Sequence, residues 1–430
     1  MSTHMFRTFA LILLAAITAA PAWAQSGPRI CTPTTQNIFV RDVLDEYYYW
    51  YRELPRLNVS NYPSPEAYLD AARYRPLDES FSYITSRAAN EAFYGDSQFV
   101  GFGFSTQTSP TELRVLQVFP DSPASEAGLA RGARIVEIDG RAVSELIATG
   151  EIGGAFGASE IGVARTIVFR TRTGEERRAS IVKRLVTIPT VSLTRTFDVN
   201  GRRVGYIFFR NFVEPSFDAL SQAFGALGEA GATDLILDVR YNGGGLVDVA
   251  VHLGSLIGGV VTEGRVFATF EHNDKNAPLN ETLRFESKPN ALTLPRLFVI
   301  TTRGSASASE LLINSLRSHI PVTVIGDPTY GKPVGQYGFP FCDKVFAPVA
   351  FKLVNADGQG DYFGGIPPDC VAADDADHDL GTAEEASLRE ALTVIRTGSC
   401  SVPPTATGQS LRAGRTAFRA TGWQSLVNAY

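Results

Sequence analysis

The sequence has no excess of positive charge and no basic stripe. Its 39 lysines and arginines against 45 aspartates and glutamates give a formal net charge of −6, and the basic run from Arg412 to Arg419 is sparse. Proteins that neutralise phosphates usually carry such an excess, which argues against nucleic acid as a partner. The composition is otherwise ordinary for a globular protein. The 430 residues are enough for two or three domains, each with its own core.

Long hydrophobic runs are also scarce. The run FALILLAAITAA near the N-terminus precedes the small residues Ala22 and Ala24, as expected at a signal-peptide cleavage site. It is short for spanning a bilayer, so we interpret residues 1–24 as a signal peptide cleaved after Ala24 rather than as an uncleaved anchor. The later run VDVAVHLGSLIGGVV is interrupted by Asp248 and His252. We therefore expect an exported protein, periplasmic or extracellular.

The chain has only four cysteines. Disulfides persist in exported proteins, and four cysteines allow three pairings. Cys342 and Cys370 flank a strand-rich segment, whereas Cys31 and Cys400 flank the whole core. We therefore expect the pairs Cys342–Cys370 and Cys31–Cys400, with free buried thiols as the alternative.

Hydrophobic periodicity divides the chain into four parts after the signal peptide. Residues 25–98 show helical spacing in VRDVLDEYYYWYREL and SPEAYLDAARY, which we interpret as packing against a neighbouring domain. Short strands with two helices fill residues 99–190. Strands alternate with helices over 191–397, which predicts a sheet covered by helices. Residues 398–430 form a polar tail. The predicted fold is multidomain α/β (α+β) with a mixed sheet.

The stretch GSASASE, residues 304–310, lies between a predicted buried strand and a predicted helix. Ser307 and Glu310 fit a capping box, and Ser307 could be no more than a helix cap. Alternatively, Ser307 is a nucleophile at a helix N-terminus, where free N–H groups can hold an oxyanion. The alanines would then leave room for a substrate backbone.

A nucleophilic serine needs a base. Lys332, in the turn DPTYGKPVGQ, is the better candidate, because burial would lower its pKa and let it act as a base near neutrality. His252 and His319 lie on predicted helices. The histidines that follow the signal segment, none of them in a loop rich in small residues, are His252, His272, His319 and His378.

A glycine cluster, residues 243–245 in DVRYNGGGL, follows another predicted buried strand. Successive glycines let a ligand approach the backbone closely. The lysine and Ser/Thr of a phosphate-binding loop are missing.

Four segments in this order, DVRYNGGGL, GSASASELL, GKPVGQ and GGIPPDC, closely resemble the carboxyl-terminal processing peptidases, or tail-specific proteases. These are serine endopeptidases with a Ser–Lys dyad, and the resemblance covers most of residues 35–395. It implies that no metal or cofactor is needed. The roles it implies are Ser307 as nucleophile, Lys332 as general base, Gln336 as the group that orients the lysine, and the N–H groups of Gly244 and Ala308 as the oxyanion hole.

Residues 99–190 resemble a PDZ domain through VGFGF and SPASEAGLARGARIVEIDG. Backbone N–H groups of Gly101, Phe102, Gly103 and Phe104 would hold a terminal carboxylate while the peptide adds a strand to the sheet. Alternatively, the domain only packs on the protease and gates it.

The acidic segment DDADHD, residues 374–379, lacks the spacing and the glycine of a calcium loop. We interpret it as a solvated acidic turn.

Together these features predict an exported serine endopeptidase that cleaves proteins near their C-termini. By the family resemblance, its substrates would have apolar C-termini. Three alternatives are a non-catalytic peptide-binding scaffold with the same fold, a Ser–Lys hydrolase of a non-protein ester, and a related protease with a histidine base. The sequence leaves open an adaptor protein, homo-oligomer formation and the role of the tail.

Overall fold

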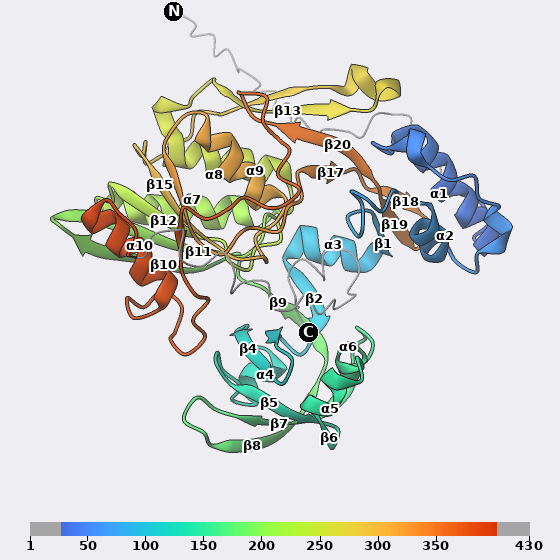
Figure 1. Ribbon diagram of the computed structural model, residues 1–430, viewed down its shortest axis with the longest axis horizontal. Helices are drawn as coiled ribbons and strands as arrows, with labels where there is room; N and C mark the ends of the chain where they lie inside the picture. The colour runs from blue at the N-terminus through green and yellow to red at the C-terminus, as the bar shows by residue number, and fades with distance from the viewer. Residues whose placement is uncertain (1–26, 402–430) are drawn as a thin grey trace, which may run out of the picture.

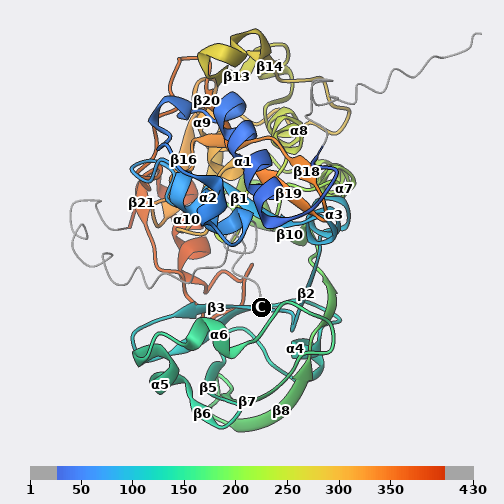
Figure 2. The same ribbon diagram turned by 90° about the vertical axis from the view of Figure 1, so that its right-hand side faces the viewer.

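The computed structural model describes residues 27–401. A large α/β body carries the N-terminal helices on one side, and a smaller β-rich body lies below it (Figures 1 and 2). This mixture confirms the predicted α/β fold class with a helical N-terminal region. The expected signal peptide and most of the tail lie outside the described residues. Between residues 27 and 401, no helix is both long enough and apolar enough to cross a membrane.

The large body is built on a six-stranded sheet in the order β10-β11-β12-β15-β16-β21. Only β10 and β11 pair antiparallel; the remaining neighbours are parallel. Strands β12 and β15 are buried throughout, as expected for parallel strands covered on both faces. The strands are β10 (Val191–Val199), β11 (Arg202–Phe209), β12 (Asp234–Asp238), β15 (Leu297–Thr301), β16 (Val322–Gly326) and β21 (Cys370–Val371).

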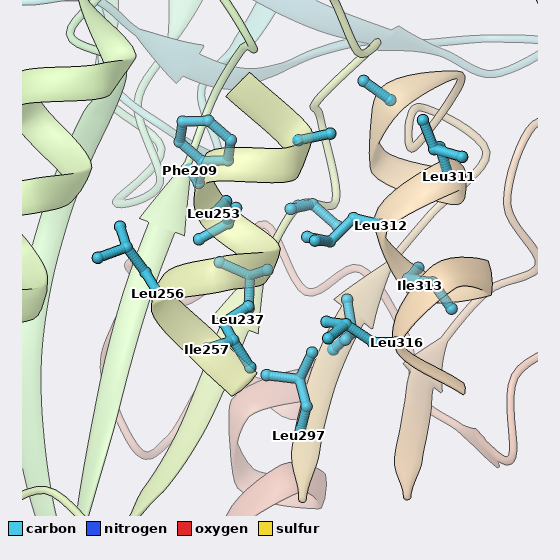
Figure 3. Close-up of a cluster of buried hydrophobic side chains, with 14 of the residues drawn as sticks. Phe209, Leu237, Leu253, Leu256, Ile257, Leu297, Leu311, Leu312, Ile313 and Leu316 are labelled. Carbon is cyan, nitrogen blue, oxygen red and sulfur yellow. The ribbon is translucent and has the colours of Figure 1, made fainter. Parts of the chain in front are cut away.

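Helices cover both faces of this sheet. Leu237 belongs to the hydrophobic core formed with α7, α8 and α9, whereas its neighbour Ile236 belongs to the core formed with α10. This alternation follows from the two-residue period of a strand. Figure 3 shows Leu253 of α8 facing Leu312 of α9 in the first core. The helices are α7 (Ser216–Glu229), α8 (Val247–Gly258), α9 (Ala308–Arg317) and α10 (Ala386–Thr397).

The N-terminal helices share a core with strands from the far end of the chain. The helix predicted through Leu54 ends at Tyr47, because Tyr49 N–H donates to the carbonyl of Val349 and leaves the helical path. Helix α2 begins as predicted, with the Ser64 hydroxyl accepting from Ala67 N–H. The elements are α1 (Pro33–Tyr47), η1 (Tyr51–Glu53), η2 (Val59–Asn61), α2 (Pro65–Ala72), β1 (Tyr83–Ser86) and α3 (Arg87–Asp96).

Two small sheets join this region to the large body. Strand β1 pairs antiparallel with β19 in the order β1-β19-β18, and the second sheet has the order β14-β13-β20-β17. Their remaining strands are β13 (Val266–His272), β14 (Thr282–Arg284), β17 (Val334–Gln336), β18 (Phe339–Phe341), β19 (Lys344–Ala347) and β20 (Val349–Val354). Two 3-10 helices, η3 (Gly259–Val261) and η4 (Asp274–Leu279), precede and follow β13.

The β-rich body has its own hydrophobic core and a sheet in the order β3-β4-β5-β7-β8, with β6 beside β5. A short β2–β9 pair connects it to the rest of the molecule (Figure 1). Its elements are β2 (Gln98–Gly101), β3 (Phe104–Thr108), β4 (Leu113–Val118), α4 (Pro123–Glu126), β5 (Arg134–Ile138), β6 (Arg141–Ala142), α5 (Val143–Ala148), α6 (Ile152–Ala155), β7 (Ala164–Arg170), β8 (Glu176–Val182) and β9 (Arg184–Thr187).

All four cysteines form disulfides, but the predicted pairing is wrong. The structure joins Cys31 to Cys342 and Cys370 to Cys400. The first bond ties the segment before α1 to the turn between β18 and β19, and the second ties β21 to the end of α10. The pairing depends on which segments share a surface, which sequence order does not reveal. Glu390 lies beside the second pair, but disulfide sulfurs cannot bind a metal as thiolates.

The interpretation of residues 374–379 as a solvated acidic turn is confirmed only in part: residues 377–379 are exposed, but the Asp374 side chain is almost fully buried. Three arginines of the β-rich body bind it: Arg131 Nη2 lies 3.3 Å from Asp374, Arg172 Nη2 lies 2.9 Å from Asp379, and Arg114 pairs with Asp377. Arg131 also donates to the carbonyls of residues 375 and 378 and, at 2.8 Å, to the hydroxyl of Tyr241. The turn is therefore the surface on which the β-rich body docks.

The docking contact yields the first testable prediction. Arg131→Ala removes an almost fully buried guanidinium and the hydrogen bonds that it donates to backbone carbonyls, whereas Asp374 keeps its donors Tyr241 and Arg240. The loss should destabilise the docked arrangement by about 3 kcal/mol. Hydrogen exchange of the 374–379 amides should then become faster. The control is Arg178→Ala, which breaks an exposed pair with Glu137. Equal exchange rates in wild type and Arg131→Ala would contradict the docking role.

Candidate active site

Three loops meet at one edge of the central sheet, where β12, β15 and β16 end. The loops hold residues 239–246, 302–307 and 327–333. Adjacent parallel strands end at the same edge, and ligand sites in such sheets form there. The sheet thus collects the glycine cluster, the three serines and the lysine, which lie far apart in the sequence.

The structure distinguishes the three serines. Ser305 and Ser309 are fully buried, and their hydroxyls donate to the carbonyls of Val239 and Asn242 at 2.7 and 2.9 Å. Ser307 is partly exposed. The outer two hydroxyls therefore fix the loop, and the middle one is accessible to a ligand.

Ser307 has an unusual backbone conformation, with φ 54° and ψ −114°. A non-glycine residue at positive φ is strained, and such strain collects at functional sites. Ser307 is the N-cap of α9, and its N–H donates to Glu310 Oε2 at 2.9 Å. The predicted capping box is therefore present. The Glu310 hydrogen bond therefore holds Ser307 in a strained backbone conformation, and a helix cap alone does not require such a conformation.

The glycine cluster packs directly on Ser307. Gly244 has φ +97°, and a Cβ there would lie 2.7 Å from Ser307 Cβ and 2.8 Å from Ala308 N. Only glycine fits at this position. The Asn242 carbonyl accepts from Ala306 N–H at 3.0 Å, which holds the two loops together. The Gly244 N–H donates to Asn242 Oδ1 at 2.9 Å, whereas no acceptor for Ala308 N–H lies within residues 27–401.

Glu310 is the site residue whose role sequence reasoning missed. Its fully buried carboxylate accepts four hydrogen bonds. Oε2 binds the backbone N–H groups of Ser307 and Lys332 at 2.9 and 2.8 Å. Oε1 binds Gly331 N–H at 2.6 Å and the Thr329 hydroxyl at 2.5 Å. Burial raises the pKa of Glu310, and these four hydrogen bonds oppose the rise. The capping-box spacing was visible in the sequence, but the contacts with residues 329–332 were not.

Lys332 is buried, with 5% of its surface exposed. Burial lowers the pKa of its ammonium to about 8, and the negative charges of Asp78 and Glu310 oppose part of that fall. A group with this pKa is partly neutral near physiological pH and can accept a proton. The backbone N–H groups of Ser307 and Lys332 thus both donate to one oxygen atom, Oε2 of Glu310.

Gln336 lies in β17, four residues after Lys332. Its Nε2 donates to the carbonyl of Phe81 at 2.7 Å, which fixes the carboxamide. The histidine rings are engaged elsewhere. Their partners are Ser221 for His252, Asn280 and Tyr337 for His272, Val266 for His319, and Asp375 for His378.

A buried ionic cluster supports the glycine loop from behind. Arg240 is fully buried and donates to Asp238 at 2.9–3.1 Å and to Glu385 at 2.7 and 2.8 Å. Glu385 also caps α10, because it accepts from Leu388 N–H. Buried charges need such complete pairing. The cluster therefore ties the end of β12 to α10 and fixes where the glycine loop starts.

The contacts of Glu310 predict a large effect of Glu310→Gln. The amide group would place an N–H₂ donor against two existing donors, so we expect the free energy of unfolding to fall by about 3 kcal/mol. Urea denaturation measures this loss. The control is Glu384→Gln at an exposed position, expected to change stability by less than about 0.5 kcal/mol. Equal stability of Glu310→Gln and wild type would show that the four bonds contribute nothing.

Two family models match the chain. Residues 203–372 match peptidase family S41, and residues 35–83 match the peptidase S41 N-terminal domain. A carboxy-terminal-processing protease of Bartonella bacilliformis is 27% identical over 277 residues, which are 61% of this chain and 60% of the relative. The CtpA-like serine protease assigned in Staphylococcus haemolyticus is 24% identical over 299 residues, 69% of this chain and 57% of the relative. The chain thus spans about 60% of the length of these curated relatives.

Solved structures share the fold. A Bacteroides fragilis protein assigned to the S41 proteases superposes with a TM-score of 0.67 at 23% identity, covering 84% of this chain and 97% of its own. The photosystem II D1 C-terminal processing protease gives a TM-score of 0.50 at 22% identity, covering 81% and 94%. At these identities the likeness establishes the fold, and the family models add a sequence match over residues 35–83 and 203–372, the second of which contains the three loops. The chain belongs to peptidase family S41.

Proposed function

We propose that this protein is a serine endopeptidase that cleaves protein chains near their C-termini. The observation that carries the proposal is the shared carboxylate of Glu310, which binds the backbone of both Ser307 and Lys332 while leaving the Ser307 side chain accessible. The match to the S41 family and the relatives' names support the same reaction. Proteins with apolar C-termini are the proposed substrates.

In the acylation step, Ser307 Oγ attacks the carbonyl carbon of the scissile peptide bond. Neutral Lys332 takes the hydroxyl proton, and the ammonium then gives that proton to the leaving amine. The C–N bond breaks, and an acyl-enzyme ester and a free amine result. Lys332 is suited to both transfers, because its pKa of about 8 lies close to neutral pH.

Backbone N–H groups would stabilise the negative charge on the carbonyl oxygen during this step. Ala308 N–H, at the N-terminus of α9, is one proposed donor. The Gly244 N–H is the second, and it would turn from Asn242 Oδ1 to the oxyanion. In the second half of the reaction, Lys332 removes a proton from water, the hydroxide attacks the ester, and Ser307 recovers its proton. Gln336, fixed by Phe81, is the proposed group that orients the lysine.

The β-rich body is proposed to act as a PDZ-like receptor for the C-terminal end of the substrate. Gly101, Phe102, Gly103 and Phe104 form the turn from β2 into β3, at one end of the strand order. Gly103 has φ +91°, and a Cβ there would lie 2.1 Å from Ser122, so the turn requires glycine. Strand addition to β3 would be the mode of peptide binding. An exported enzyme, periplasmic or extracellular, that uses an adaptor or forms a homo-oligomer is compatible with this arrangement.

The nucleophile is tested by Ser307→Ala. Cleavage of an unfolded protein with an apolar C-terminal tail should fall by at least about 10³-fold, because the acyl-enzyme cannot form. Gel electrophoresis and mass spectrometry of the products measure the cleavage. The control is Ser309→Ala, which removes a buried neighbouring hydroxyl and should retain cleavage. If neither wild type nor variant cleaves while the full-length protein binds the same tail, the chain is a peptide-binding scaffold.

The base is tested by the pH dependence of kcat/KM. Lys332 must be neutral to accept the serine proton, so kcat/KM should rise tenfold per pH unit below about pH 8 and level off above it. A fluorogenic peptide assay between pH 5 and pH 10 covers this range; those limits are about three units below and two above the expected midpoint. Lys332→Ala should abolish the activity. An acid limb near the ordinary histidine value of about 6.5 would instead indicate a histidine base.

A further inference from the structure

A segment of the N-terminal region, residues 78–82, lies against the loop that carries Lys332. The Phe81 ring packs edge-on against Tyr330, with centroids 6.1 Å apart, and the Phe81 carbonyl accepts from Gln336 Nε2 at 2.7 Å. Tyr330 and Gln336 flank Lys332 on either side in the sequence. The segment therefore contacts the lysine loop on both sides of the lysine.

This segment is firmly attached to the large body. Strand β1, which follows it directly, pairs with β19 from Tyr83 to Ser86. The Ser82 hydroxyl accepts from Val349 N–H at 2.9 Å and donates to Asp78 Oδ2 at 2.6 Å. The position of Asp78 is thus set by strands of the same body that holds Lys332.

Asp78 is fully buried, and its hydrogen-bond donors are all neutral. Its carboxylate accepts from the Tyr48 hydroxyl at 2.9 Å and from the N–H and hydroxyl of Ser82 at 2.9 and 2.6 Å. Across residues 27–401, no lysine or arginine lies within salt-bridge distance of it. A buried carboxylate without a direct ionic partner is costly unless it acts on a nearby positive charge.

The ammonium of Lys332 is such a charge. Two carboxylates act on it, Glu310 from α9 and Asp78 from the N-terminal region, and Asp78 has the larger influence of the two. Glu310 is already saturated by four donors, one of them the amide of Lys332 itself. Two further titratable groups interact with these carboxylates, Tyr48 with Asp78 and Tyr362 with Glu310, and Arg73 acts on Tyr48.

We propose that Asp78 is a positioning residue of the catalytic centre: its buried carboxylate supplies the negative charge that favours the ammonium form of Lys332, across the contact between residues 78–82 and the lysine loop. The Phe81 carbonyl, three residues on, fixes Gln336 on the other side of the lysine. The inference rests on the proposed function, in which Lys332 is the base. The N-terminal region, interpreted from the sequence as packing alone, would then complete the active site.

The direct test is a pH titration of Lys332, observed by NMR in the full-length Ser307→Ala protein labelled with ¹³C-lysine. Asp78→Asn removes a negative charge that favours the ammonium, so the Lys332 midpoint should move to lower pH by about one unit. The control is Glu79→Gln, which removes the same charge from the exposed neighbouring side chain and should leave the midpoint unchanged. An unchanged midpoint in a folded Asp78→Asn protein would overturn the proposal.

A second variant separates charge from structure. Ser82→Ala breaks hydrogen bonds of the same segment but keeps the carboxylate, so it should lower stability without moving the midpoint. If it moved the midpoint as far as Asp78→Asn does, geometry and not charge would control Lys332. If Asp78→Asn does not fold, Asp78→Ser removes the same charge and keeps a hydroxyl for the Tyr48 and Ser82 partners. An unchanged Lys332 midpoint in that variant would overturn the proposal.

These titrations need no substrate, which keeps the two proposals distinguishable. In an active protein, the acid limb of kcat/KM should move down by the same amount, about one pH unit, in Asp78→Asn and stay in place in Glu79→Gln. If wild type cleaves nothing but the Lys332 midpoint still moves in Asp78→Asn, the peptidase proposal fails and the influence of Asp78 on Lys332 stands. If wild type is active and Asp78→Asn moves neither the Lys332 midpoint nor the acid limb, the peptidase proposal stands and the role of Asp78 fails.

Discussion

The arrangement of the site depends on one buried carboxylate. A charged group taken out of water is stable only when its lone pairs are filled by donors, and Glu310 obtains all four of its donors from two neighbouring loops. The strained Ser307 and the buried Lys332 are held in place by the same requirement. The serine and lysine loops are thus positioned together, because both donate hydrogen bonds to the same carboxylate.

The rest of the molecule supports the loops that surround Glu310. The parallel strands bring the three loops to one edge of the sheet, and helices on both faces bury the strands from solvent. The Arg240 cluster and the close fit of Gly244 on Ser307 fix the glycine loop from two sides. Tyr241, a residue of this loop, contacts the β-rich body directly, because its hydroxyl accepts from Arg131 and donates to Asp374. The position of the β-rich body is therefore mechanically connected to the loop next to the serine.

Local pattern predicted much of this architecture. The alternating strands and helices of the second half gave the sheet, and Ser64 and Ser307 marked helix starts because capping is a local interaction. The motifs also placed Ser307, Gly244 and Lys332 at strand ends. Long-range contacts were not predictable in the same way. The end of α1 at Tyr47, the Cys31–Cys342 bond and the docking of arginines on the turn 374–379 each depend on a partner more than 200 residues away. The second role of Glu310 was hidden for a related reason, because a capping residue and a ligand of a distant loop look identical in a sequence.

The residues around the proposed active site are far apart along the chain, which affects when the site forms during synthesis and folding. Asp78, Gly244, Ser307 and Gln336 are contributed by stretches that leave the ribosome one after another, and the last contacts form only after β19 and β20 have been made. The proposed catalytic centre is therefore complete only late in synthesis, when β19 has paired with β1 and residues 78–82 contact the lysine loop. If the enzyme cleaves unfolded chains, its own misfolded copies are potential substrates for the folded ones.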